Sequence, residues 1–74
     1  MLTVKETELA MERFFNDSLN FWKRIGFDER QAFEAALEDT KKITTNPFSP
    51  RGDKLDQETK INFIKYREMD LGRR

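Results

Sequence analysis

The chain has no cysteine and no histidine, and each absence removes a class of chemistry. Without cysteine there are no disulfides and no thiolate metal ligands, which suits a reducing compartment such as the cytoplasm. Without histidine the commonest metal ligand and the usual general base are missing. No acidic loop with the spacing of a calcium site is present either. We therefore expect a cytoplasmic protein with no metal and no cofactor.

An excess of one charge and long apolar runs are also absent. The 14 basic and 14 acidic side chains cancel, so bulk charge does not indicate a nucleic-acid-binding protein. Apolar runs reach only two or three residues, which predicts no membrane span and no secretory signal. The 74 residues predict one domain, 1–74, with a small core. Such a domain depends on close packing or on oligomerisation when disulfides and metals are lacking.

Helical periodicity is what the sequence does contain. It predicts an all-α three-helix bundle with helices over about 3–25, 28–43 and 55–71. The first helix begins with a capping box of Thr3 and Glu6 and ends before Gly26. Its apolar arc is wide, roughly 160° around the helix axis. The arc contains Val4, Met11, Phe14, Phe15, Leu19, Phe21, Trp22 and Ile25.

The segment between the first two helices, RIGFDERQ at residues 24–31, predicts a tight corner. Gly26 suits the left-handed position that follows many helices, and Phe27 would then contact Trp22. Asp28 is expected to cap the second helix together with Gln31. The second helix buries a face of small and apolar residues. These are Ala32, Phe33, Ala36, Leu37, Thr40 and Ile43.

Residues 25–37, IGFDERQAFEAAL, resemble the start of ubiquitin-associated domains, in which a Met-Gly-Phe-type loop joins two helices of a three-helix bundle. The resemblance implies that Ile25, Gly26 and Phe27 form this loop, which binds ubiquitin in that family together with part of helix 3. The long first helix and the inserted loop after the second helix depart from the family pattern. The resemblance therefore implies a similar bundle shape, and we assign no family from it.

Two prolines, Pro47 and Pro50, predict a long loop over residues 44–54. Phe48 and Leu55 are expected to hold this loop against the bundle. The third helix then begins near Asp53 or Asp56, since both residues are suitable N-caps. It ends near residue 71, before a glycine.

No constellation of catalytic side chains is present. Glu34 and Glu38 are one helical turn apart, as a paired acid–base site requires, but they lie on the polar face of the second helix. The sequence contains no phosphate-binding loop and no nucleophile with a neighbouring base. We therefore expect a protein that is not an enzyme.

The third helix is apolar on two faces, which one small bundle does not explain. Ile61, Ile64 and Leu71 form one stripe, while Phe63 and Tyr66 point to nearly the opposite side. Contiguous exposed apolar surface usually marks an interface. We therefore predict an interaction module that binds a protein partner or a second copy of itself. The expected contact residues are Phe15, Leu19, Trp22, Phe63 and Tyr66.

The alternative hypothesis is a small nucleic-acid-associated regulator that uses its basic C-terminal end. Its contact residues would be Lys65, Arg67, Arg73 and Arg74. A helix-turn-helix is disfavoured because Trp22 is too large for the close helix crossing of that motif. The second helix is also rich in acidic residues, which phosphates repel.

Overall fold

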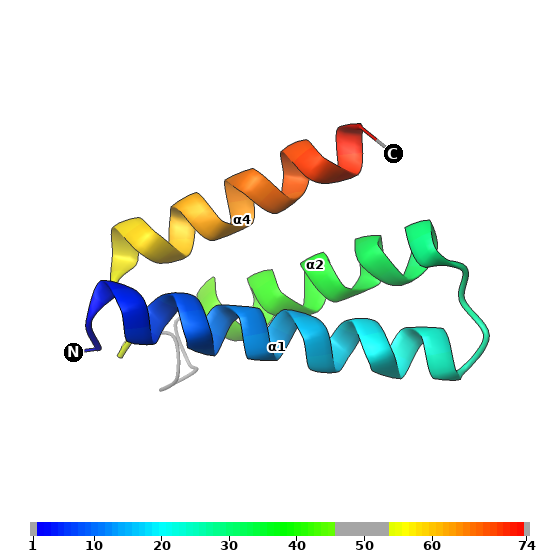
Figure 1. Cartoon of the computed structure of the whole chain (residues 1–74), viewed down its shortest axis with the longest axis horizontal. Helices are drawn as coiled ribbons and strands as arrows, with labels where there is room; N and C mark the ends of the chain where they lie inside the picture. The colour runs from blue at the N-terminus through cyan, green and yellow to red at the C-terminus, as the bar shows by residue number, and fades with distance from the viewer. Residues whose placement is uncertain (1, 46–53, 74) are drawn as a thin grey trace.

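The computed structural model describes residues 2–45 and 54–73, and three α-helices make up most of this part of the chain (Figure 1). They are α1 (Val4–Arg24), α2 (Glu29–Thr45) and α4 (Gln57–Gly72). α1 and α2 form an antiparallel hairpin, and α4 returns alongside both, in the same direction as α1. The predicted all-α three-helix bundle is therefore confirmed.

The start of α1 is fixed by the predicted capping box. The Thr3 hydroxyl accepts a hydrogen bond from the Glu6 backbone N–H at 3.1 Å, and the Glu6 carboxylate accepts one from the Thr3 N–H at 3.1 Å. The hydrogen bond from the Thr3 backbone lowers the pKa of Glu6, and the Thr3 side chain lowers it by a smaller amount. Two N–H groups that a bare helix end leaves without partners are thus satisfied.

The corner after α1 has the predicted Schellman geometry. Gly26 has a φ of 112°, in the left-handed region, and its N–H donates to the Lys23 carbonyl at 3.2 Å. The Phe27 N–H donates to the Trp22 carbonyl at 3.1 Å, and the two rings lie 4.9 Å apart. These bonds satisfy the last carbonyls of α1 and fix the angle at which the chain leaves it.

The start of α2 follows at once. The Asp28 carboxylate accepts a hydrogen bond from the Gln31 N–H at 2.7 Å, which confirms Asp28 as the N-cap. Further along, the Trp22 indole N–H donates to Asp39 at 2.7 Å and ties α1 to α2. The corner therefore holds two helices in a defined hairpin.

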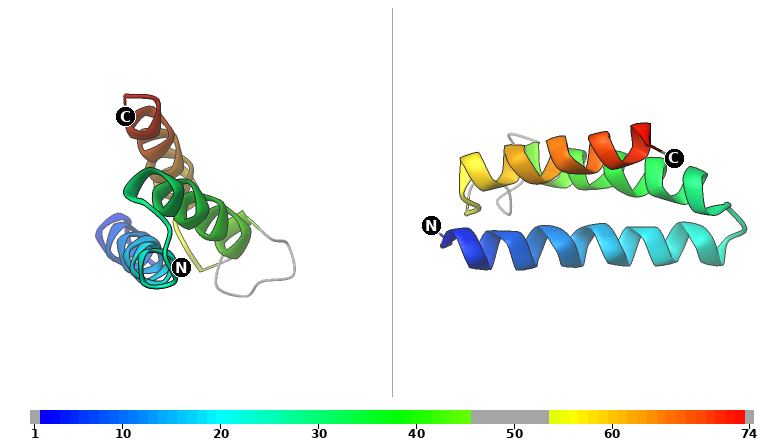
Figure 2. Two further views of the ribbon diagram at one scale, coloured as in Figure 1. Left: turned by 90° about the vertical axis from the view of Figure 1, so that its right-hand side faces the viewer. Right: turned by 45° about the horizontal axis from the view of Figure 1, so that its top comes forward.

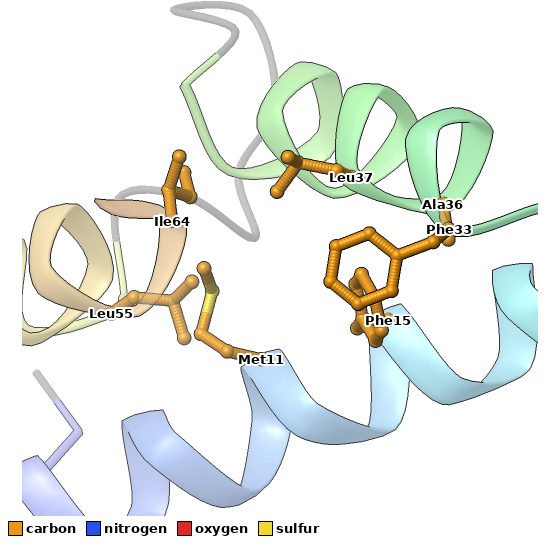
Figure 3. Packing of buried hydrophobic residues seen from close by; sticks show 7 residues of the cluster. All are labelled: Met11, Phe15, Phe33, Ala36, Leu37, Leu55 and Ile64. Carbon is orange, nitrogen blue, oxygen red and sulfur yellow. The ribbon is translucent and has the colours of Figure 1, made fainter. Parts of the chain in front are cut away.

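The apolar core lies where the three helices face one another (Figure 3). Phe15 and Phe33 meet edge to face with ring centroids 5.0 Å apart, an arrangement that aromatic quadrupoles favour. Ala36 has no exposed surface, and its small side chain permits close approach of α1 to α2. The remaining members of the cluster are Met11, Leu37, Leu55 and Ile64.

The end of α2 differs from the prediction. The helix continues through Thr45 instead of ending near Ile43, because Pro47 restricts only the residue directly before it. The buried Lys60 side chain of α4 donates to the Thr44 carbonyl at 2.8 Å, so a cation meets the negative end of α2. The predicted loop beyond this point lies at residues 46–53, outside the described part of the chain, together with Phe48.

The start of α4 is joined to α1. Asp56 is the N-cap and accepts from the Thr59 N–H at 3.0 Å and from the Thr59 hydroxyl at 2.7 Å. Both hydrogen bonds lower the pKa of Asp56, and the bond from the Thr59 hydroxyl has the larger effect. The Asp56 N–H donates to the buried Thr7 hydroxyl of α1 at 2.9 Å, and the Leu2 N–H donates to the Lys54 carbonyl at 2.7 Å. The N-terminal ends of α1 and α4 are therefore held side by side.

Candidate functional site

An open groove of about 610 Å³ runs between α1 and α4. α4 begins beside α1 and diverges from it along its length, so that α2 lies between the two helices only toward the C-terminal end of α4 (Figures 1 and 2). The α1 wall consists of Val4, Glu8 and Glu12, which recur every four residues and so share one helix face. We call this feature, with the α4 residues that line its other wall, the α1–α4 groove.

Aromatic side chains from α4 form the apolar part of the α1–α4 groove. Phe63 is half-buried, and its ring lies 6.3 Å from that of Phe15 in the core. Tyr66 also lines the groove and is 65% exposed. The structure thus brings together two of the five residues that the sequence predicts as interface contacts.

Acidic side chains dominate the polar part of the groove. Glu8 and Glu12 on α1 face Asp56 and Glu58 on α4, with Arg67 as the single basic lining residue. Glu8, Glu12 and Glu58 make no ion pair with any residue of 2–45 or 54–73. No three carboxylates in these ranges gather closely enough to hold a metal ion. Within the described ranges the negative charge is therefore spread along the groove, and three of its four carboxylates have no ion pair.

Arg67 closes the inner side of the groove. Its guanidinium carbon lies 5.1 Å from the centroid of the Phe15 ring and 4.9 Å from that of Phe63. This geometry is a double cation–π contact, and Asp70 adds an ion pair at 3.7 Å. The sequence does not indicate this role, since the charge of Arg67 suggested a contact with nucleic acid. Because Arg67 follows Lys65 by two positions, the two side chains project from different faces of α4.

The other basic residues of the nucleic-acid hypothesis are separate from this contact. Lys65 and Arg73 are exposed, and Arg74 lies outside the described residues. Lys41 of α2 binds Glu68 of α4 at 2.6 Å, and this hydrogen bond raises the pKa of Lys41. With Arg67 directed to aromatic rings and Lys60 directed to α2, the described part of α4 offers no continuous basic face.

The structure places two apolar side chains differently from what the sequence indicates. Phe15 is a core residue, only 3% exposed, because it lies at the centre of the α1 arc that faces both other helices. Ile61, which shares an apolar stripe with Ile64 and Leu71, is 61% exposed, while Phe63 turns toward the core. Lys60 and Arg67 occupy part of the inner face of α4, so the most apolar side of this helix is not its buried side.

The far end of the hairpin carries a second apolar surface. Phe21 and Ile25, which belong to the apolar arc of α1, are 55% and 54% exposed. The cause is geometric, since α4 diverges from α1 and leaves this end covered by α2 alone (Figure 1). Trp22 contacts both Phe21 and Phe27 and is half-buried, as is Leu19. Leu19 and Trp22 therefore do not belong to the lining of the α1–α4 groove, which contains Phe63 and Tyr66.

Comparison with known proteins returns no relative: no family model, no curated protein and no solved structure matches the chain. Among the described residues, no helix combines the length and apolar character needed to cross a membrane.

Proposed function

We propose that the protein is a non-catalytic interaction module that binds another protein chain in the α1–α4 groove. The observation that carries this proposal is the exposure of Tyr66 beside Phe63 in a groove where three carboxylates have no ion pair among the described residues. A tyrosine in such a place presents apolar area and a polar tip at low entropic cost, which is why tyrosine is enriched at interfaces. The lack of cysteine supports a cytoplasmic location for this binding.

Core residues support the same proposal. Phe63 contacts Phe15, and Arg67 lies over both rings, so the floor of the groove is anchored in the bundle. A surface that is rigid before binding loses little conformational entropy on complex formation. The helices therefore present Tyr66 from a fixed platform.

Two matched variants test the proposal. Tyr66→Ala removes the exposed ring in the groove, whereas Ile61→Ala removes a side chain of similar exposure on the same helix but outside the groove. Both variants should keep the wild-type melting temperature within a few degrees, because neither residue is buried. Immobilised wild-type and Ile61→Ala proteins should retain the same partner from a lysate of the native host, and Tyr66→Ala should lose it.

Sedimentation velocity of the purified chain over a wide concentration range identifies self-association. Concentration-dependent dimers that Tyr66→Ala abolishes would make the partner a second copy. Equal retention and equal sedimentation of all three proteins would contradict the proposal.

A further inference from the structure

The acidic walls of the α1–α4 groove restrict what can bind there. Four carboxylate residues and one arginine line it, and three of the carboxylates have no ion pair within the described residues. A partner that brings negative charge would meet repulsion from both walls, whereas a cationic partner would be attracted. The carboxylates are too dispersed for a metal ion, so the complementary charge must also be dispersed.

The groove also restricts the backbone of its occupant. It lies between two helices whose own backbone groups bond within each helix, and it has no strand edge to offer along residues 2–45 and 54–73. A bound α-helix satisfies its backbone hydrogen bonds internally and so needs no strand edge, which favours a helix as the occupant. The α1 wall spans residues 4–12 and the α4 wall spans 56–67, lengths of about 12 to 17 Å. A helix of about three turns covers this distance.

A second copy of the chain fits the groove poorly. A two-fold dimer places the same patch of each copy against the other. Glu8, Glu12 and Glu58 of one copy would then face the same carboxylates of its partner. Like charges placed opposite each other disfavour association. The negative charge of the groove walls therefore favours a partner other than a second copy of this chain.

We infer that the occupant of the α1–α4 groove is a basic amphipathic helix of another protein, with an apolar anchor against Phe63 and Tyr66 and Lys or Arg side chains toward Glu8, Glu12 and Glu58. This inference rests on the proposed function of the groove. The bound helix would be the fourth of the bundle and would cover the open walls of the groove between α1 and α4.

Two synthetic peptides test the inference on the intact chain. Both are three-turn helices with the same apolar face, locked by a side-chain crosslink because helices this short are mostly unfolded in water. One has lysine on both flanks of the apolar face, and the other has glutamate. Each is titrated into the isotope-labelled protein while backbone amide signals are recorded. The lysine peptide should shift the amides of Glu8, Glu12, Asn62 and Tyr66, and the glutamate peptide should not.

Charge variants provide the matched control. Glu8→Gln, Glu12→Gln and Glu58→Gln together should weaken binding of the lysine peptide about tenfold, since each exposed charge pair contributes a modest amount. Asp17→Asn, Glu34→Gln and Glu38→Gln remove as much charge outside the groove and should change the affinity less than about twofold. Added salt should weaken the wild-type complex.

Three results would overturn the inference. They are binding of neither peptide, equal binding of both, and shifts confined to the hairpin end around Phe21. If the lysine peptide does not bind while Tyr66→Ala still loses a native partner, the proposed interaction module stands. Only the inference that its partner is a basic helix is then contradicted. If Ile61→Ala and Tyr66→Ala also behave identically, the proposed function falls as well.

Discussion

Single residues decide the corner between α1 and α2. Gly26 is the only described residue with a positive φ, and a Cβ placed on it would meet nothing within 4 Å. A side chain there would therefore cause backbone strain without a steric clash. Phe27 and Trp22 add a ring contact across the same turn. The conformation that glycine permits is thus the main requirement at this position.

Gly26→Ala should lower the free energy of unfolding by about 1 kcal/mol, because alanine disfavours the left-handed region. Gly72→Ala is the matched control, since Gly72 lies in the last turn of α4 and also has open space around it. That change should be neutral or slightly stabilising. Urea denaturation followed by circular dichroism measures both. Equal effects of the two changes would mean that the turn does not depend on glycine.

Asp56 gives the protein a defined response to acid. Hydrogen bonds from Thr59 lower its pKa in the folded state, so ionised Asp56 stabilises the fold above the ordinary aspartate value of 3.8. This contribution is lost as the pH falls through the lower folded value. Asn is also a good N-cap but does not titrate.

The stability advantage of wild type over Asp56→Asn should therefore shrink as the pH is lowered from neutral to below 3.8. Urea midpoints at several pH values measure this difference. Asp17→Asn, which removes an exposed carboxylate in the middle of α1, is the control for general charge effects. An advantage that grows on acidification would show that the cap does not depend on an ionised Asp56.

At the scale of elements, α4 is joined to α1 and to α2 by polar contacts as well as by apolar packing. Ile64 is its buried apolar residue, Leu55 is buried just before the helix begins, and the buried Lys60 meets the carbonyl end of α2. Hydrogen bonds to buried groups orient an element because few other arrangements satisfy them. The bond from the Asp56 N–H to Thr7 links α4 directly to α1.

Thr7→Val keeps the shape of the side chain but removes the acceptor for the Asp56 N–H. It should destabilise the protein by about 1 to 2 kcal/mol, because a partly buried donor loses its partner. Thr40→Val is the control, since the Thr40 hydroxyl bonds only to the Ala36 carbonyl of its own helix. Thermal unfolding of both variants gives the comparison. A cost for Thr40→Val that equals the cost for Thr7→Val would remove the special role of the link.

Elements with strong local signals were predictable from sequence. The capping box at Thr3 and the corner at Gly26 depend on neighbouring residues, so their patterns indicate them directly. The inner face of α4 was not predictable, because Arg67 lies over Phe15 and Phe63, which are distant from each other in sequence. A helical wheel places arginine on the solvent-facing side and cannot show that its side chain contacts two aromatic rings.

The candidate site was only half predictable for a similar reason. Tyr66 and Phe63 stood out as surplus aromatic residues, and both line the groove. The acidic wall of α1 was visible in the four-residue spacing of Val4, Glu8 and Glu12, but its meaning depends on α4 lying opposite. The divergence of α4 from α1 is a tertiary property (Figure 1).

At the scale of the whole molecule, the three helices make an asymmetric bundle. α1 and α2 pack along their length, while α4 covers one end of α1 and leaves an acidic, aromatic groove at its side (Figures 1 and 2). We propose that another protein chain occupies this groove.

Site-specific photocrosslinking in living cells tests that claim most directly. A photoreactive amino acid replaces Tyr66 in one variant and Ile61 in another, so the two probes lie on the same helix, inside and outside the groove. We predict a discrete crosslinked product of higher mass from position 66 and none from position 61. Products of equal yield from both positions, or no product from position 66, would contradict the account.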